Sequence, residues 1–398
     1  MKRNNRKVFV LLALLLLVLA SGYVYAADIK KLALNTTIHS APAQRQADTW
    51  QINVPAAGKM NVVLSHENLF STDVYWTAQL LAQDMETVLQ EFDSKGTDEV
   101  LTGASLGVTR GTYYVRVYAR KECGHSYSDK PYGLNVKFQE SSTWEIEYNS
   151  DAKGGNDSQG KATPMKLKKN YYGTICDSKD VDFFKVVVPG NGYLTLTFSH
   201  PNIYKAENYW TVQLVNSKTE AFYELTSAGT KKKTTSTQIG VSKGTYYVKV
   251  TGGGGWNSRW DSSDYTVYVK YTKSSSWEQE YGDKTKHNNN TMSYANTIKA
   301  GKKIKGTLSQ ASDVDFYKVK ISSTRTVNIN FAHEYMPKKS KYWTITIYNS
   351  KTKEVMSFTS RGIDKSLSKK IRLKKGTYFI KISQGTKWNK KPYTLKIK

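Results

Sequence analysis

The sequence predicts an all-β protein of three tandem antiparallel β-sandwiches. Apolar and polar residues alternate with a period of two along many short segments, for example residues 210–214 and 246–250, which is typical of strands with one buried face. Turn-forming clusters such as residues 189–192 separate these segments. The pattern also recurs, because Trp144 and Trp277 begin matching segments 133 positions apart. A repeat of that length is a whole domain.

Residues 1–26 are predicted to be a secretory signal peptide. Four cations precede an apolar core at residues 8–20, and residues 24–26 form a small-x-small cleavage site. This core is shorter than the roughly 20 residues that span a membrane, so we expect an exported, soluble chain with no transmembrane anchor. The rest of the chain divides into repeat 1 (27–139), repeat 2 (140–272) and repeat 3 (273–398).

The chain is strongly basic. Its formal net charge is +26, or +22 without the four cations of the signal peptide. Such an excess suits an anionic polymer such as an acidic glycan or a cell-wall polyelectrolyte. Alternatively, the scattered lysines keep the strands soluble and protect the sheet edges. No nucleic-acid-binding motif accompanies the charge, so we expect no nucleic-acid partner, and we expect a monomer.

The chain has two cysteines, Cys123 and Cys176. They occupy non-equivalent places in repeats 1 and 2, so they belong to no repeated disulfide framework. An exported protein could still pair them, and a disulfide and two isolated thiols both stay open.

Two ring-bearing residues recur in all three repeats. A tryptophan shares strand parity with apolar neighbours, so we predict that it points into the core: Trp76, Trp210 and Trp343. A histidine lies ten positions earlier at the end of a strand, and we interpret it as a structural hydrogen-bonding residue: His66, His200 and His333. No Ser-His-acid, Cys-His or His-Glu-x-x-His pattern accompanies these histidines, so we expect no enzymatic activity. Residues 77–92 alone carry a hint of a helical pattern.

Acidic residues gather near the start of repeats 2 and 3. Pairs spaced by two leave an extended segment on one face: Glu145/Glu147, Glu278/Glu280, Asp180/Asp182 and Asp313/Asp315. Oxygen-rich clusters of this kind suit Ca²⁺, which takes six to eight ligands. Repeat 1 has no Glu-x-Glu segment and carries Gln46 where repeat 2 has Asp180, so the acids are lost together. Alternatively, Glu-x-Glu is a solvated linker and the aspartate common to all repeats caps a turn.

Several motifs in a fixed order resemble the bacterial pre-peptidase C-terminal domain family, which includes the collagen-binding domains of bacterial collagenases. The motifs are Glu-x-Glu-x-Asn, Asn-[Asp/Asn]-[Ser/Thr]-x-x-x-Ala-[Thr/Asn]-x-[Met/Ile], Gly-x-[Ile/Leu], Asp-Val-Asp-Phe-[Phe/Tyr], a strand tryptophan and Gly-Thr-Tyr-[Tyr/Phe]. They cover nearly all of repeats 2 and 3, and repeat 1 without its leading segment. The resemblance implies jelly-roll-like sandwiches whose N-terminal linker folds back to bind calcium.

Carried over residue by residue, the resemblance implies two calcium sites. In repeat 2 it points to Glu145, Glu147, Asn149 and Asp182, with Asp180 as a further ligand. In repeat 3 it points to Glu278, Glu280 and Asp315, with Asp313 as a further ligand. The chain departs from the family pattern after each Glu-x-Glu, which adds Asn156, Asp157 and Asp283 to the candidate ligands.

In collagen-binding members of the family, ligand contact resembles aromatic recognition on the outer face of the late strands. Strand parity points these residues outward here: Tyr247, Lys249, Tyr268, Lys270, Tyr114, Arg116, Phe379 and Lys381. Aromatic rings beside cations suit an extended polymer. Alternatively, the tyrosines form cross-strand pairs that only stabilise the sheet.

The predicted function is therefore that of a secreted, non-catalytic binding protein. Its tandem calcium-stabilised modules would attach to an extracellular or cell-surface polymer, whether polysaccharide, cell wall or collagen-like, and linked weak sites would add avidity. The alternative is a structural spacer or an accessory domain array that works beside a secreted hydrolase.

Overall fold

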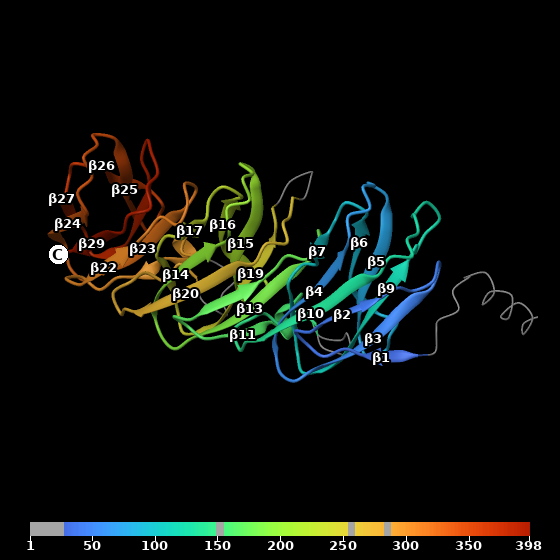
Figure 1. Cartoon of the computed structure of the whole chain (residues 1–398). Coiled ribbons are helices and arrows are strands. Elements are labelled where there is room, and N and C mark those ends of the chain that lie inside the picture. Colours follow the sequence, from blue (N-terminus) through green and yellow to red (C-terminus); the bar gives the residue numbers. More distant parts are fainter. Residues whose placement is uncertain (1–27, 149–154, 254–258, 282–287) are drawn as a thin grey trace, which may run out of the picture. The chain divides into compact units, whose positions relative to one another are not determined.

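The computed structural model describes residues 28–148, 155–253, 259–281 and 288–398. Almost every element in these residues is a β-strand, and the strands form six sheets in three pairs (Figure 1). The helical elements in the described residues are two short 3-10 turns, η1 (Gln159–Lys161) and η2 (Met292–Tyr294). The prediction of an all-β protein built from repeated sandwiches is confirmed.

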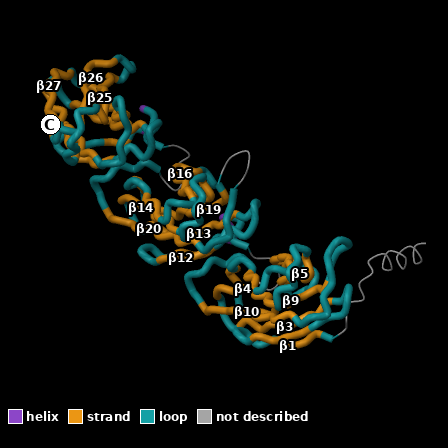
Figure 2. Tube along the Cα trace, turned by 45° about the horizontal axis from the view of Figure 1, so that its top comes forward, coloured by secondary structure: helices purple, strands orange, loops and turns teal. Residues whose placement is uncertain are grey.

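The described residues form two compact units. The first contains residues 28–142 with Tyr148, and the second contains residues 143–147 with 155–398. In both units, strands alternate with loops and turns along the trace (Figure 2). The predicted repeat boundaries at residues 139 and 272 stay a prediction.

The first unit holds one sandwich. One sheet has the strand order β1-β3-β9-β5-β6, and the other has the order β2-β10-β4-β7 with β8 beside β4. The strands are β1 (Ile29–Lys31), β2 (Thr37–Ser40), β3 (Ala47–Val54), β4 (Gly58–His66), β5 (Val74–Leu81), β6 (Val88–Lys95), β7 (Val100–Thr102), β8 (Leu106–Val108), β9 (Gly111–Ala119) and β10 (Tyr132–Glu140).

The second sandwich repeats this arrangement. Its sheets have the orders β11-β13-β19-β15-β16 and β12-β20-β14-β17, with β18 beside β14. The strands are β11 (Thr163–Met165), β12 (Asn170–Gly173), β13 (Val181–Val188), β14 (Gly192–Ser199), β15 (Asn208–Asn216), β16 (Ala221–Ala228), β17 (Lys233–Thr235), β18 (Ile239–Val241), β19 (Gly244–Gly252) and β20 (Tyr265–Lys273).

The third sandwich has the orders β21-β23-β28-β25-β26 and β22-β29-β24-β27. Here one continuous strand, β27, stands where the other sandwiches have two short ones. The strands are β21 (Asn296–Thr297), β22 (Lys303–Gly306), β23 (Val314–Ile321), β24 (Arg325–His333), β25 (Lys341–Asn349), β26 (Glu354–Arg361), β27 (Ser366–Leu373), β28 (Gly376–Gln384) and β29 (Tyr393–Ile397).

The sandwiches are not purely antiparallel, because each contains one parallel pair of strands. In each sandwich the short leading strand runs parallel to its neighbour, as β1 does to β3, β11 to β13 and β21 to β23. The reason is topological, because the chain crosses to the opposite sheet between these two strands and returns in the same direction. This crossover places the leading strand beside the strand that carries Asp48, Asp182 or Asp315.

The recurrent tryptophans and histidines form part of each core. The indole rings of Trp76, Trp210 and Trp343 are fully buried, as predicted. In the second sandwich His200 Nε2 lies 3.0 Å from Ser227 Oγ, and Nδ1 lies 2.7 Å from the Pro201 carbonyl oxygen. The imidazole also packs on Trp210, with ring centroids 3.9 Å apart. His66 and His333 make the corresponding contacts, so the structural role predicted for the histidines is confirmed.

The hint of a helix at residues 77–92 is wrong. These residues form most of the antiparallel hairpin of β5 and β6. The turn is closed by Asp84, whose Oδ1 accepts the N–H groups of Glu86 and Thr87, while Met85 adopts φ 63°. A local side-chain turn of this type competes with helix formation and reverses the chain.

Candidate metal centres

Three carboxylates converge in the second sandwich. Glu145 and Glu147 come from the segment that precedes η1, and Asp182 comes from β13. One carboxylate oxygen from each of the three lies within 4.8 Å of the others, and all three side chains are at most 3% exposed. The predicted closure of the Glu-x-Glu segment onto the Asp-x-Asp strand is thus present in the geometry of this sandwich.

Glu145 is held by named donors. The backbone N–H of Thr174 donates to Oε1 at 2.7 Å, and the hydroxyl of Tyr265, which donates to Asp182 Oδ2 at 2.5 Å, lies 3.2 Å from Oε2. Between the two glutamates, the N–H of Ile146 donates to Thr163 Oγ1 at 2.9 Å. These hydrogen bonds hold the segment with the two glutamates against the sandwich.

A glycine makes room for the Glu145 carboxylate. A Cβ atom on Gly173 would lie only 2.3 Å from Glu145 Oε2 and 2.4 Å from the Tyr265 hydroxyl. Neither position is compatible with a side chain, so glycine is required here by close approach. This is the glycine of the Gly-x-[Ile/Leu] motif.

The third sandwich repeats the arrangement with different neighbours. Glu278, Glu280 and Asp315 converge in the same way, and all are buried. The N–H of Thr307 donates to Glu278 Oε1 at 2.6 Å, and the Tyr393 hydroxyl donates to Asp315 Oδ2. The remaining support follows the same pattern: Gln279 N–H donates to Asn296 Oδ1 at 2.6 Å, and a Cβ on Gly306 would lie 2.5 Å from Glu278 Oε2.

The electrostatics of both clusters are unfavourable for bare carboxylates. Burial, with repulsion from neighbouring acids, raises the pKa of Glu145 and Asp182 well above the usual range. Burial likewise raises the pKa of Asp180 to about 6 and that of Glu278 to about 7. Within the described part of the chain, no lysine or arginine forms an ion pair with Glu145, Asp182, Glu278, Glu280 or Asp315. Ionised acids buried together without a countercharge are costly.

Buried oxygen atoms in both clusters are free to act as further ligands. Asn156 donates its amide N–H to Glu145 Oε2 at 3.4 Å, and its own Oδ1 has no hydrogen-bond partner in the described residues. Asn289 is placed in the same way beside Glu278. Asp182 Oδ1 and Glu280 Oε2 also lack partners among the described residues. A hard divalent cation takes carboxylate and amide oxygens of this kind, so the residues present fit Ca²⁺.

A cysteine lies beside the cluster in the second sandwich only. Glu147, Cys176 and Asp180 also lie close together, and the N–H of Cys176 donates to Asp180 Oδ2 at 2.6 Å. In the third sandwich Ser309 takes this place and makes the same 2.6 Å bond to Asp313. Because burial also raises the pKa of the Cys176 thiol, the shared ligand chemistry of both sites is that of oxygen. Neither Cys123 nor Cys176 takes part in a disulfide.

The first sandwich satisfies the equivalent aspartate from within the chain. Lys30 Nζ lies 2.7 Å from Asp48 Oδ1, and Ser40 Oγ and the Tyr132 hydroxyl donate to Oδ2 at 2.5 and 2.8 Å. Burial alone would raise the pKa of Asp48, but the bonds from Lys30, Ser40 and Tyr132 together with the charge of Lys30 lower it.

The strand register shows which residues changed between the sandwiches. Lys30 stands opposite Trp50, as Thr163 stands opposite Phe184 and Asn296 opposite Tyr317. Ser40 pairs with Tyr132, as Gly173 pairs with Tyr265 and Gly306 with Tyr393. The residue that anchors the Glu-x-Glu segment is thus replaced by a lysine, and the glycine that admits the glutamate is replaced by a serine.

The structure sorts the remaining predicted ligands. Asp180 and Asp313 are buried at the edge of their clusters. Asp157 is exposed and accepts the Val181 N–H at 3.4 Å, and its role as a ligand stays a prediction. Its side chain caps the start of β13, while Asn156 takes the buried position. Asn149 and Asp283 lie outside the described residues.

Asn289 was not among the predicted ligands, although the Asn-[Asp/Asn] motif aligns it with Asn156. The pairing of Lys30 with Asp48 was also not predicted. It could have been found by aligning Ile29-Lys30 with Ala162-Thr163 and Ala295-Asn296, because this places a lysine beside the aspartate in repeat 1 alone.

The predicted aromatic binding surface does not form a single surface. Tyr247 and Lys249 lie on β19 and Tyr268 lies on β20, which belong to opposite sheets of the sandwich, so their outer faces point in opposite directions. Strand parity shows that a residue points out of its own sheet, but it does not show which sheet that is. Lys249 Nζ instead lies 5.9 Å from the ring centroid of its neighbour Phe183. Tyr114 and Phe379, on β9 and β28, are half-buried.

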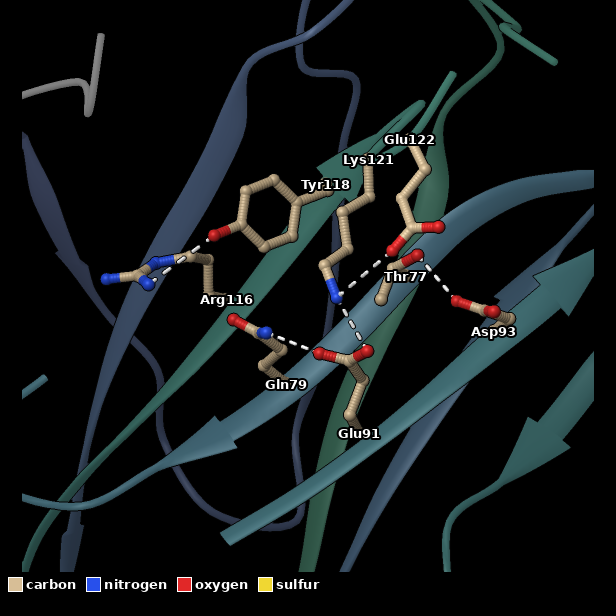
Figure 3. A network of polar contacts seen from close by, with 8 residues as sticks. All are labelled: Thr77, Gln79, Glu91, Asp93, Arg116, Tyr118, Lys121 and Glu122. Carbon is tan, nitrogen blue, oxygen red and sulfur yellow. Dashed lines mark hydrogen bonds and ion pairs between the residues drawn. The ribbon is translucent and has the colours of Figure 1, made fainter. Parts of the chain in front are cut away.

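Arg116 is not an exposed cation, and this prediction is wrong. Its side chain is 7% exposed, because the β5–β6 turn covers it and the Met85 carbonyl oxygen accepts from Nη2 at 3.1 Å. Figure 3 shows Arg116 beside Tyr118 in a polar network on one face of the sheet. In the same network Lys121 Nζ lies 2.6 Å from Glu91 Oε1, and Gln79 donates to Glu91 Oε2 at 2.5 Å.

One family model matches part of this chain. Residues 323–394, within the third sandwich, match the secretion system C-terminal sorting domain. The chain is accordingly a secreted protein, as predicted. No curated protein matches the chain. Among the described residues, no helix has the length and apolar character needed to cross a membrane.

Several solved structures resemble parts of the chain. A pre-peptidase C-terminal domain of collagenase from Bacillus anthracis is 22% identical, with a TM-score of 0.23, covering 28% of this chain and 97% of that domain. PliG of Aeromonas hydrophila, a periplasmic inhibitor of g-type lysozyme, is 14% identical, with a TM-score of 0.21, covering 28% and 98%. The CUB1-EGF-CUB2 domains of rat MASP-1 are 11% identical, with a TM-score of 0.20, covering 61% and 100%. These similarities carry no information about a ligand.

Proposed function

We propose that this chain is a secreted, non-catalytic protein that attaches to an extracellular or cell-surface polymer through sandwiches of the pre-peptidase C-terminal type. In the second and third sandwiches, Ca²⁺ holds the Glu-x-Glu segment against the domain that follows it. The observation that carries the calcium proposal is the pair of buried carboxylate clusters with equivalent geometry. Burial together with repulsion from neighbouring acids raises the pKa of Asp182 in one cluster and of Asp315 in the other. The Lys30–Asp48 pair at the matching place in the first sandwich supports it, because there a built-in cation meets the same need.

The chain would bind the ion through residues from three places. Glu145 and Glu147 come from the linker, Asp182 from β13, and Asn156 from the segment before η1. The bound ion would supply the missing positive charge, and the buried oxygen atoms would coordinate it. Thr174, Tyr265 and Thr163 position the linker acids, and Gly173 leaves them space.

The spacer alternative is favoured by the linker before the third sandwich. While Glu278 and Glu280 reach into the third cluster, the next residue bonds to the second sandwich. The N–H of Tyr281 donates to the Gly240 carbonyl oxygen at 3.2 Å, its hydroxyl donates to Glu220 at 2.8 Å, and its ring stacks on Phe222 at 4.7 Å. One short segment therefore serves two domains, which suits a stiffened rod that positions a partner enzyme as well as a polymer-binding array.

Calcium binding is tested by thermal unfolding of the mature protein in EDTA and in 1 mM Ca²⁺. We expect Ca²⁺ to raise the melting temperature, and the double change Glu278→Gln with Glu280→Gln to remove part of the rise. Terbium luminescence titrated with Ca²⁺ provides a direct measure of occupancy. Equal melting curves with and without the ion would overturn the metal proposal. Attachment is tested separately by retention on insoluble glycans, isolated cell wall and fibrillar collagen.

A further inference from the structure

In the first and second sandwiches, one loop exposes an aromatic side chain to solvent from a residue with a left-handed backbone. Phe70 is 89% exposed and Tyr204 is 84% exposed. Both lie four residues after the recurrent histidine, and both adopt a left-handed backbone conformation, with φ of 52° and 57°. Bulky aromatic residues rarely adopt positive φ, and they remain there only where the surrounding structure enforces it.

The surroundings enforce it in the same manner in both sandwiches. The N–H of Phe70 donates to Asn68 Oδ1 at 2.8 Å, and the N–H of Tyr204 donates to Asn202 Oδ1 at 2.9 Å. The preceding residue is pinned by its backbone, since Leu69 N–H donates to the Gly96 carbonyl oxygen at 2.8 Å and Ile203 N–H to that of Gly229 at 3.1 Å. The loop is thus fixed up to the aromatic residue, which makes no contribution to the core.

A second exposed ring lies on the neighbouring loop of each sandwich. Tyr127 follows Ser126, whose hydroxyl donates to Asp73 Oδ2 at 2.8 Å, three residues beyond Phe70. In the second sandwich, the exposed ring is Trp260. It follows Arg259, which pairs with Glu207 at 3.7 Å, three residues beyond Tyr204. Each sandwich therefore carries two aromatic side chains on two loops that are bonded to each other.

The charge of these loops argues for an uncharged ligand. The two loops of the first sandwich, residues 67–73 and 120–131, contain three cations and four anions. The two loops of the second, residues 200–207 and 259–264, contain two cations and three anions. In a chain of net charge +26, the lysines are therefore not gathered at these tips. A polyanion or an anionic membrane would be met by clustered cations.

The third sandwich differs and provides an internal control. Pro337 stands at the position of Phe70 and Tyr204, and proline cannot adopt a positive φ. Its exposed Tyr335 is covered on one side by Lys365, whose Nζ lies 5.5 Å from the ring centroid. Its two loops, residues 334–340 and 385–392, contain five cations and one anion.

We propose that the loop pairs carrying Phe70 with Tyr127 and Tyr204 with Trp260 are binding sites for a neutral polysaccharide. The C–H face of a sugar ring carries partial positive charge and packs on the electron-rich face of an aromatic ring, while nearby Asn, Ser, Asp and Glu side chains bond the hydroxyls. This inference rests on the proposed function and names the polymer class and the contact surface. It replaces the outward strand tyrosines as the point of contact.

The test uses the mature protein and three insoluble neutral glycans: microcrystalline cellulose, chitin and a linear β-1,3-glucan. The double variant Phe70→Asn with Tyr204→Asn removes both rings, and asparagine tolerates the left-handed backbone, so the fold is kept. We expect retention of the parent protein on at least one glycan, little changed by 0.5 M NaCl, and roughly tenfold weaker retention of the double variant. Val187→Thr, at an exposed apolar residue elsewhere, should bind like the parent.

The outcomes separate the two proposals. Retention of the parent and the double variant to the same extent overturns the loop sites but leaves polymer attachment in place, and Tyr247→Ala then identifies the face responsible. Binding only to collagen or to anionic lipid vesicles, or no binding to any neutral glycan, also overturns the loop sites. Absence of binding to glycan, cell wall and collagen alike overturns the proposed function itself.

Discussion

Asp48 in the first sandwich and Asp182 in the second occupy equivalent positions at the start of a strand, and each accepts a hydrogen bond from a tyrosine hydroxyl. Their surroundings differ in three places. The first sandwich has Lys30 and Ser40 where the second has Thr163 and Gly173, and it has no Glu-x-Glu segment.

The comparison shows two ways to satisfy a buried aspartate on the same scaffold. A local lysine with a serine hydroxyl needs nothing from outside the chain. Under the calcium proposal, three converging acids are satisfied by a bound cation, which also ties a linker to the domain. A side chain at the position of Gly173 would overlap the Glu145 carboxylate, so a serine there is incompatible with the glutamate in this place.

Removal of calcium should have the largest effect on this comparison. At Ca²⁺ a hundredfold above the dissociation constant, each site adds about 3 kcal/mol, so EDTA should lower the melting temperature of the second unit by roughly 10 °C. Hydrogen-exchange mass spectrometry should locate the change at residues 143–147 and 278–281, with the first unit unaffected. Equal loss of protection around Asp48 would contradict the comparison.

Filling the space at Gly173 should have the second largest effect. Gly173→Ser places atoms where the Glu145 carboxylate lies, so it should destabilise the second sandwich by roughly 2–4 kcal/mol and abolish its calcium-dependent stabilisation. Chemical denaturation in Ca²⁺ measures both. Gly160→Ser is the matched control, because no described atom lies within 4 Å of a Cβ there. A Gly173→Ser protein that keeps full calcium stabilisation would show that Glu145 is not a ligand.

The two kinds of site should respond to pH in opposite directions. In EDTA, the raised pKa values of Asp180, about 6, and Glu278, about 7, mean that folding favours the protonated form. Their contribution to stability is complete below the ordinary values of 3.8 and 4.5 and is lost as pH rises through 6 to 7. The metal-free second unit should thus unfold more easily at pH 8 than at pH 5, and Ca²⁺ should reverse this order because it binds the deprotonated acids.

The pKa of Asp48 is lowered, so its contribution is present above the ordinary value of 3.8 and is lost as pH falls toward the lowered pKa. The first unit should therefore weaken only below about pH 4. Thermal unfolding at pH 3, 5 and 8 with hydrogen exchange at each pH distinguishes the units. The same pH response in both units would mean that the pKa values of the acids in the metal-free second unit are not raised.

Loss of Lys30 should have the smallest effect. Its side chain is 43% exposed, so the ion pair with Asp48 is screened by solvent, and Lys30→Met should cost only about 0.5–1 kcal/mol. Denaturant unfolding in 0.05 M and 0.5 M NaCl checks this, because the difference between the parent and the variant should shrink at high salt. A cost above about 3 kcal/mol would mean that Lys30 is as indispensable as the cation proposed elsewhere.

Local patterns in the sequence predicted much of the fold. The period of two placed the strands and the buried tryptophans, and the fixed spacing of repeated motifs predicted three sandwiches. The helical hint at residues 77–92 was wrong because one turn, organised by Asp84, outweighed the weak periodicity. For the candidate metal site, the absence of Glu-x-Glu from repeat 1 was visible in the sequence, and it marked the acids as a set.

What the sequence determined by itself was therefore the strand pattern, the number of repeats and the acids that vary together, because these depend on residue type and spacing along the chain. Tertiary structure decided which of those residues meet. It paired Lys30 with Asp48 across 18 positions, buried Arg116 under a turn, and put Tyr247 and Tyr268 on opposite sheets. It also set Phe70 and Tyr204 at the loop tips, because their exposure and backbone conformation come from contacts with distant segments.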